Sequence, residues 1–231
     1  VAGKKTKEAR EIIVQWLKEQ KLLLKEEIVD LNISTAERSG GVIEPLPKLQ
    51  WFIAVNKEFS IKKSSISGIG GDQTTTLKEI MRKSVENGQI KIIPEREEKK
   101  YFHWINNLRD WNISRQLWYG HRIQVWYHEP KCVPHYGHKN DTTTKCKEMI
   151  VDLEKPKCQF CDAKFVQDPD TLDTWFSSAL WTFSILGWPD KKSSDLKRFH
   201  PTNFMNPGYE ILFFWVARMI LASGFLLGEI P

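Results

Sequence analysis

A chain of 231 residues is long enough to bury a hydrophobic core and to form one or two domains. Its hydrophobic and charged fractions, 41% and 27%, are ordinary for a soluble globular protein and exclude a chain of extreme composition. The formal net charge of +5 permits contact with nucleic acid without requiring it, because lysines and glutamates alternate, as at Lys18-Glu19 and Lys25-Glu26. Most of these charges are therefore expected on solvated helix faces.

The first third of the chain predicts a helix, a strand and a loop. A helix is expected over residues 6–24, where apolar residues recur at spacings of three and four and Thr6 is available as the N-cap. Two prolines then precede a strand over residues 51–55. Residues 60–76 are rich in Ser, Gly and Thr, and they predict an exposed loop and the best candidate for a mobile segment.

Four further elements are expected before the cysteines. Residues 77–85 predict a second helix, with Gly88 placed to end it. A strand over residues 89–93 follows and stops at a proline. Aromatic and aliphatic residues mark a third helix over 101–108, and residues 122–127 alternate like a strand. Alternating strands and helices indicate a mixed α/β chain.

The last predicted element is a helix that begins at about Gly208 and is apolar nearly all round, so it should be buried. Its run from 211 to 227 has the apolar character of a membrane span. Arg218 lies near the middle of this run, and a central arginine costs about 2.5–3.5 kcal/mol on insertion scales. A helix inside a globular core is therefore the favoured interpretation, with no membrane partner.

Four cysteines cluster late in the chain, at Cys132, Cys146, Cys158 and Cys161. Because the sequence has no secretory features, this clustering favours metal binding over disulfides. The pair Cys158 and Cys161 has the spacing of a zinc knuckle. The alternative is a degenerate knuckle with free thiols.

Three stretches are more specific than the rest: residues 109–123 (RDWNISRQLWYGHRI), 168–181 (DPDTLDTWFSSALW) and 208–219 (GYEILFFWVARM). Together they resemble the valine-specific branch of the class I aminoacyl-tRNA synthetases. The upstream run 37–45 (ERSGGVIEP), followed by residues 50–52 (QWF), is similar to that family too. The similarity runs in the family's order from near residue 1 to the end.

The resemblance implies a substrate pocket. It places Trp175, Ile211 and Trp215 around the amino-acid side chain, in a small apolar slot, although periodicity alone would make them core residues. We expect Ile211 and Trp215 to share one helix face, because they are four residues apart. Glu210 stands where the family usually has an aspartate, and its carboxylate could bind an amino group or a ribose, or complement the helix dipole. For Arg115, packing or hydrogen bonding is expected rather than catalysis.

The resemblance also implies a domain plan and a metal. Residues 1–30 would be the tail of an inserted editing domain, 31–127 an α/β region returning to the catalytic domain, 128–166 a zinc-binding excursion, and 167–231 the second half of a Rossmann-like catalytic domain. One structural zinc held by Cys132, Cys146, Cys158 and Cys161 is the hypothesis, with His128 as the substitute ligand. No catalytic role is expected for the zinc.

A full-length parent would activate valine with ATP and Mg²⁺ as valyl-adenylate and transfer it to tRNA-Val, as a cytoplasmic, monomeric aminoacyl-tRNA ligase. The family's Lys-Met-Ser-Lys-Ser motif does not occur in this sequence, and its one His-x-Gly-His string, residues 135–138 (HYGH), lies among the cysteines and not near the start of the enzyme, where the family's nucleotide signature belongs. We therefore expect an internal fragment that has neither aminoacylation nor editing activity alone. Two alternatives stay open: an isoleucine-specific sister synthetase and a non-catalytic zinc- and RNA-binding module.

Overall fold

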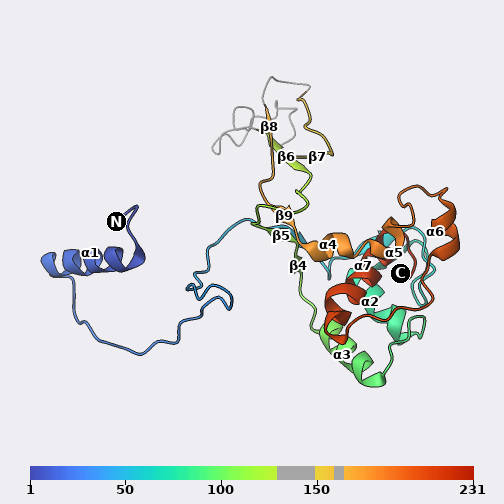
Figure 1. The fold of residues 1–231 in the computed structure, drawn as a ribbon, viewed down its shortest axis with the longest axis horizontal. Helices are drawn as coiled ribbons and strands as arrows, with labels where there is room; N and C mark the ends of the chain where they lie inside the picture. Colours follow the sequence, from blue (N-terminus) through green and yellow to red (C-terminus); the bar gives the residue numbers. More distant parts are fainter. Residues whose placement is uncertain (129–148, 159–163) are drawn as a thin grey trace. The chain divides into compact units, whose positions relative to one another are not determined.

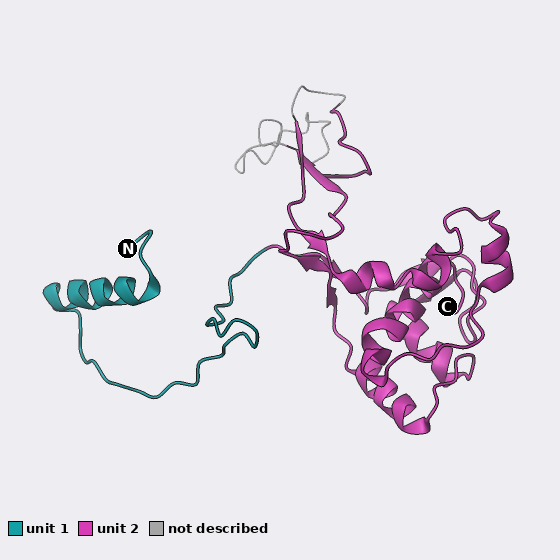
Figure 2. Cartoon of the chain, in the orientation of Figure 1, with its two compact units in different colours: residues 1–48 teal, residues 49–231 magenta. Residues whose placement is uncertain are grey.

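The computed structural model describes residues 1–128, 149–158 and 164–231, and these form two compact units, Val1–Lys48 and Leu49–Pro231 (Figure 2). The segment boundaries implied by the resemblance stay predictions, because the two units carry no information about the function of each segment.

The first unit contains one helix, α1 (Thr6–Glu19). The predicted helix is confirmed, but it ends five residues before the predicted limit, and Gln20 is its C-cap. Thr6 is the first helical residue and not the N-cap, which is Lys5 without a side-chain capping bond. No residue of α1 is buried within the unit, and its apolar residues Ile12 and Trp16 are exposed.

The second unit combines short helices with short strands (Figure 1). Its helical elements are α2 (Leu77–Glu86), α3 (Glu95–Asn106), α4 (Thr174–Ser178), α5 (Trp181–Ser184), α6 (Ser194–Phe199), the 3-10 turn η1 (Tyr209–Ile211), the π-helix η2 (Leu212–Ala217) and α7 (Arg218–Leu226). Its strands are β1 (Phe52–Ile53), β2 (Phe59–Ile61), β3 (Gln73–Thr75), β4 (Trp111–Asn112), β5 (Ser114–Arg115), β6 (Val125–His128), β7 (Met149–Val151), β8 (Phe165–Gln167) and β9 (Thr171–Leu172).

The strands pair as β1–β4, β2–β3, β5–β9 and β7–β6–β8, and every pair within the described residues is antiparallel. The expected mixture of helices and strands is confirmed. A parallel sheet, which is the hallmark of a Rossmann-like domain, does not occur in the part of the chain that the structure describes. The predicted strand at 51–55 shortens to β1, and the one at 122–127 is confirmed in its second half as β6.

Helix α2 is confirmed almost to the residue. Its start is set by Thr76, whose side chain accepts a hydrogen bond of 3.1 Å from the backbone N–H of Glu79. Gly88 follows the C-cap with a φ of +73°, the left-handed conformation that glycine adopts most readily. The apolar face of α2, including Ile80 and Met81, is buried.

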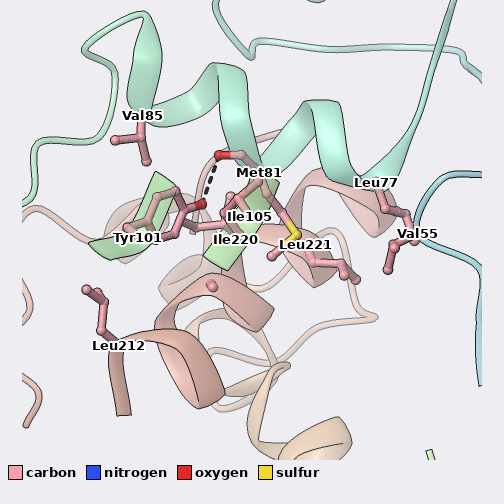
Figure 3. Close-up of a cluster of buried hydrophobic side chains, with 10 residues drawn as sticks. Val55, Leu77, Met81, Val85, Tyr101, Ile105, Leu212, Ile220 and Leu221 are labelled. Carbon is pink, nitrogen blue, oxygen red and sulfur yellow. Dashed lines mark hydrogen bonds between the residues drawn. The ribbon is translucent and has the colours of Figure 1, made fainter. Parts of the chain in front are cut away.

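The main core joins α2, α3 and the last helical run (Figure 3). Tyr101 of α3 is fully buried, and its hydroxyl donates a hydrogen bond of 2.8 Å to the backbone carbonyl of Met81. Burial raises the pKa of this hydroxyl, so Tyr101 stays protonated as a donor. The buried members of this cluster are Val55, Leu77, Met81, Val85, Tyr101, Ile105, Leu212, Ala217, Ile220 and Leu221.

The prediction of an exposed loop at residues 60–76 is confirmed for residues 62–72, which have no helix or strand and are mostly exposed, and is wrong at the two ends and at three buried isoleucines. The segment forms most of the β2–β3 hairpin, and Ile61, Ile66 and Ile69 are buried against Ile80 of α2. The backbone N–H of Ser65 also donates to the carbonyl of Gly228, which ties the segment to the end of the chain. Three isoleucines spaced through a polar segment are enough to dock it.

The predicted strand at residues 89–93 is also wrong. The segment takes no strand conformation and instead closes the end of α2, where the backbone N–H of Ile90 donates to the carbonyl of Ser84. Ile90 and Ile92 pack against the main core. Alternating apolar residues thus serve burial here without a neighbouring strand.

The final helical run is confirmed in position but not in form. Within the described residues it is the one stretch, Tyr209–Leu226, with the length and apolar composition of a membrane span, at a mean hydropathy of 1.5 over 18 residues. Its C-terminal part α7 packs on α2 and is mostly buried, whereas Phe214 and Phe225 are exposed. Complete burial, which the sequence predicted, is therefore wrong for the first half.

Candidate functional site

Three aspartates just before α4, Asp168, Asp170 and Asp173, accept hydrogen bonds from residues that are distant in the sequence. Asp168 accepts hydrogen bonds of 2.8 Å from the indole Nε1 of Trp51 and from the hydroxyl of Tyr127. Asp170 accepts one of 2.8 Å from the side-chain amide of Gln116. Burial and the neighbouring Asp168 carboxylate raise the pKa of Tyr127 to about 12, so its hydroxyl remains a donor.

Asp173 is the most highly connected of the three. One oxygen, Oδ1, caps α4 by accepting a bond of 3.3 Å from the backbone N–H of Trp175. The other oxygen, Oδ2, accepts bonds of 3.0 Å from the indole of Trp111 and 2.9 Å from the guanidinium of Arg115. Asp173 is buried, so these donors replace the water that a carboxylate otherwise binds. The hydrogen-bonding role expected for Arg115 is confirmed.

Arg218 completes this charged cluster from the junction of η2 and α7. Its side chain is 12% exposed, its Nη1 lies 3.7 Å from Oδ2 of Asp173, and its guanidinium lies 3.9 Å from the centre of the Trp111 ring. Within the described residues Nη1 has no hydrogen-bond partner. Burial lowers the pKa of Arg218 to about 10; Asp173 opposes this shift and Arg115 adds to it. The guanidinium therefore stays charged at neutral pH.

The two tryptophans of the expected pocket lie on contacting elements, α4 and η2. Trp175 of α4 stacks on Phe214 of η2, with ring centres 5.9 Å apart and planes 25° from parallel. The indole N–H of Trp215 in η2 donates a bond of 3.0 Å to the carbonyl of Ser178 in α4, and its ring lies 5.7 Å from Trp181. Both tryptophans are half-buried. This arrangement keeps part of each ring accessible to a ligand.

The other two predicted residues, Glu210 and Ile211, lie directly before the π-helix η2. Ile211 ends η1 and is half-buried, whereas Glu210 is exposed. Ile211 is the N-cap of the π-helix and Trp215 lies within it, so the two residues do not share one regular α-helix, as the sequence predicted. The π-helix contacts α3 and α4. Short π segments frequently occur at functional sites.

A cavity of about 460 Å³ lies beside Arg218, on the side of α3. Its walls come from α2, α3, β4, η2 and α7, and the predicted pocket residues are not among them. The lining residues are Val55, Met81, His103, Trp104, Asn107, Leu108, Arg109, Asp110, Trp111, Asn112, Phe213, Arg218 and Leu221. The expected pocket residues and this cavity are therefore separate features.

Sequence reasoning missed the joint role of Trp111, Asp173 and Arg218. One signal was present: a lone arginine in an apolar helix that is expected to be buried needs an anionic partner. Which of the acidic residues supplies it could not be read from the sequence, because Asp173 and Arg218 are far apart along the chain.

Most of the expected metal site lies outside the described residues, namely Cys132, Cys146 and Cys161. Cys158 is half-buried. His128 is buried at the end of β6, with its ring edge-on to Phe165 at 4.8 Å. Among residues 1–128, 149–158 and 164–231, no three His, Cys, Asp or Glu side chains are grouped as a metal would require.

The sequence matches one family description along almost its whole length. Residues 6–231 match the family described as tRNA synthetases class I (I, L, M and V).

Individual relatives agree with that match. A valine–tRNA ligase of Clostridium acetobutylicum is 42% identical over 226 residues, which cover 97% of this chain and 22% of that protein. A valine–tRNA ligase of Chlamydia pneumoniae is 41% identical over 230 residues, covering 100% of this chain and 21% of that protein. One from Geobacillus stearothermophilus is 42% identical over 225 residues, with 97% and 21% covered. The chain thus spans about a fifth of the length of the curated relatives it matches.

Proposed function

Because the chain belongs to the class I tRNA synthetases of the isoleucine, leucine, methionine and valine group, we propose that the protein that contains it is a valine–tRNA ligase. In this reaction the carboxylate of valine attacks the α-phosphate of ATP and releases pyrophosphate. A ribose hydroxyl at the end of tRNA-Val then attacks the carbonyl of the valyl-adenylate and releases AMP. The match over residues 6–231 confirms the predicted membership in the class I tRNA synthetase family.

The observation that supports a substrate slot in this chain is the contact between α4 and η2. The bond from Trp215 to Ser178 and the stack of Trp175 on Phe214 hold two indoles on adjoining elements, each half-buried. Rigid aromatic rings with accessible faces suit a small branched aliphatic side chain. We assign Trp175 and Trp215 to the walls of the valine slot and Ile211 to its rim.

Such a slot discriminates by size and not by polarity. A larger side chain is excluded by steric clash, whereas an isostere that replaces a methyl by a hydroxyl is rejected weakly, and valine-specific synthetases are themselves the standard example of this weakness. The proposed protein therefore requires hydrolytic editing, for which residues 1–30 would be the tail of the editing domain.

The remaining roles are proposals of the same kind. Glu210 is exposed at the start of the last helical run, where its carboxylate is available to an amino group or a ribose hydroxyl. Mg²⁺ would neutralise charge on the phosphates of ATP. We further propose that residues 167–231 belong to a Rossmann-like catalytic domain and that the protein acts as a cytoplasmic monomer.

The proposal is tested by pyrophosphate exchange into ATP, using the complete polypeptide that contains this sequence. Valine should support exchange with a kcat/KM about 100-fold above that for isoleucine, because a rigid slot rejects one extra methylene by about 1–3 kcal/mol. The isolated 231-residue chain should support none. Preference for isoleucine would indicate the sister synthetase. Binding of RNA without any amino-acid-dependent exchange would indicate the non-catalytic module.

The zinc hypothesis receives support from the three-stranded sheet. His128 ends β6, Met149 begins β7 and Phe165 begins β8, and the pairings Tyr127–Met149 and His128–Phe165 place these three positions at one end of the sheet. The four cysteines lie close in sequence to this end. Ligands contributed by neighbouring strand ends are the usual arrangement of a zinc knuckle.

We expect one zinc ion per polypeptide in purified, reduced protein, measured by atomic emission. Cys158→Ser should lower the zinc content and destabilise the sheet, since structural zinc contributes directly to folding. His128→Ala serves as the comparison: an unchanged zinc content there would assign the ligands to the four cysteines. Wild-type protein that contains no zinc would remove the hypothesis.

A further inference from the structure

The charged cluster around Asp173 lies at the ends of the two elements that carry the proposed slot, α4 and η2. Asp173 is the N-cap of α4, and two residues later the same helix presents Trp175. Arg218 is the C-cap of η2, and three residues earlier that π-helix presents Trp215. The ion pair between Asp173 and Arg218 therefore joins the two walls at their bases.

The chemistry of this pair makes it sensitive to the loss of either charge. Both side chains are largely buried, at 8% and 12% exposure, so each needs its partner in place of water. Trp111 contacts both members: its indole N–H donates to Asp173 and its ring face receives the guanidinium of Arg218. A shift of one member therefore moves the other two.

We propose that Asp173 is a positioning residue for the valine slot, acting through Arg218 to fix the spacing of α4 and η2; this inference rests on the proposed function. Asp173 is buried, so this role is exerted through its protein partners and not by contact with substrate. It sets the separation of Trp175 and Trp215, and hence the width of the slot. Small displacements at a binding site have large kinetic effects, because a misplacement of about 1 Å can cost about 100-fold in rate.

Asp173→Asn separates this role from helix capping. Asparagine caps helices as well as aspartate does, so the bond to the N–H of Trp175 is retained. The charge is lost, and the amide nitrogen faces the donors of Trp111 and Arg115, which have no acceptor in its place. The matched control is Asp190→Asn, an exposed aspartate whose Oδ1 accepts a bond of 2.8 Å from the N–H of Lys192.

Valine-dependent pyrophosphate exchange by the complete polypeptide gives the readout. For Asp173→Asn we expect the KM for valine to rise about tenfold or more while the KM for ATP changes by less than about twofold. The preference for valine over isoleucine should fall, because the slot is no longer held at one width. Asp190→Asn should leave all three values unchanged.

A second variant tests whether Arg218 is the connection. Arg218→Gln should reproduce the effect, and the double variant Asp173→Asn/Arg218→Gln should lose no more than either single one, since the residues act as a unit. The double variant removes both charges of the Asp173–Arg218 pair and leaves only Arg115, whose side chain is 37% exposed, without its carboxylate, so it provides the measurement if a single variant does not fold.

The outcomes are distinguishable. Wild-type protein without valine-dependent exchange would overturn the proposed function and the positioning role together. Active wild type with an unchanged KM for valine in Asp173→Asn overturns the positioning role alone. The positioning role is also overturned if the KM values for valine and ATP rise by equal factors, or if the two single effects multiply in the double variant.

Discussion

Trp215→Ala is expected to lower kcat/KM for valine activation by about 100-fold, which corresponds to about 2.7 kcal/mol of lost transition-state stabilisation. Two contributions add up to this loss. The indole ring is one wall of the proposed slot. Burial of the substrate's valine side chain against such walls contributes about 1.5–3 kcal/mol of binding free energy. Its N–H also holds η2 on α4 through the carbonyl of Ser178, so the second wall shifts as well. Pyrophosphate exchange as a function of valine concentration measures the effect.

Two further variants serve as a parallel test and as a control. Trp175→Ala should show a loss of the same order, because we assign its ring to the other wall of the proposed slot. Trp16→Ala removes a tryptophan from α1 that is 53% exposed, and we expect it to change activity by less than about twofold. If Trp215→Ala retains wild-type kinetics, the residue is part of the core and the assignment of the slot is wrong.

Ile80→Ala is expected to destabilise the second unit by about 2–5 kcal/mol, the range for removing a fully buried aliphatic side chain. Ile80 is 0% exposed and packs against Ile61, Ile66 and Ile69 of the β2–β3 hairpin segment. Its loss therefore leaves a cavity that faces several elements. Urea unfolding followed by tryptophan fluorescence gives the free energy. A change below about 1 kcal/mol would mean that the hairpin is not docked on α2.

A partner substitution on α7 makes this test specific to the α2–α7 contact. A Cβ atom added at Gly224 would clash with Cγ2 of Ile80, so Gly224→Ala overpacks the interface and should cost about 1–3 kcal/mol. In the Ile80→Ala background Cγ2 is absent, and the same substitution should cost far less. Equal costs in both backgrounds would contradict the contact.

Local signals in the sequence explain where prediction succeeded. Helix α2 was predictable because its periodic apolar residues and Gly88 indicate the same boundaries. The family was predictable because three long motifs occur in order. Residues 60–76 were misjudged in part, because Ser, Gly and Thr make up most of their composition, whereas three isolated isoleucines are buried against α2.

The candidate site was predictable only in part, because its geometry depends on contacts between distant residues. The motifs indicated Trp175 and Trp215, and these do lie on contacting elements. The π-helix was not predictable, since the sequence of η2 reads as an ordinary apolar helix. The cluster of Asp173, Trp111 and Arg218 was missed because its members are far apart along the chain.

The composition of the main core has a consequence for how the chain folds during synthesis. Both α2 and α3 have been synthesised once the ribosome reaches Asn106. The residues that cover their apolar face, however, begin only at Leu212. On the ribosome this face is therefore exposed to solvent while the intervening sequence is translated, and such surfaces are prone to aggregate and to recruit chaperones. The antiparallel pairs β1–β4 and β5–β9 can form before Leu212 is synthesised. The ion pair between Asp173 and Arg218 can form only after Arg218 has left the ribosome. The two walls of the proposed slot are thus among the last parts of the unit to assemble.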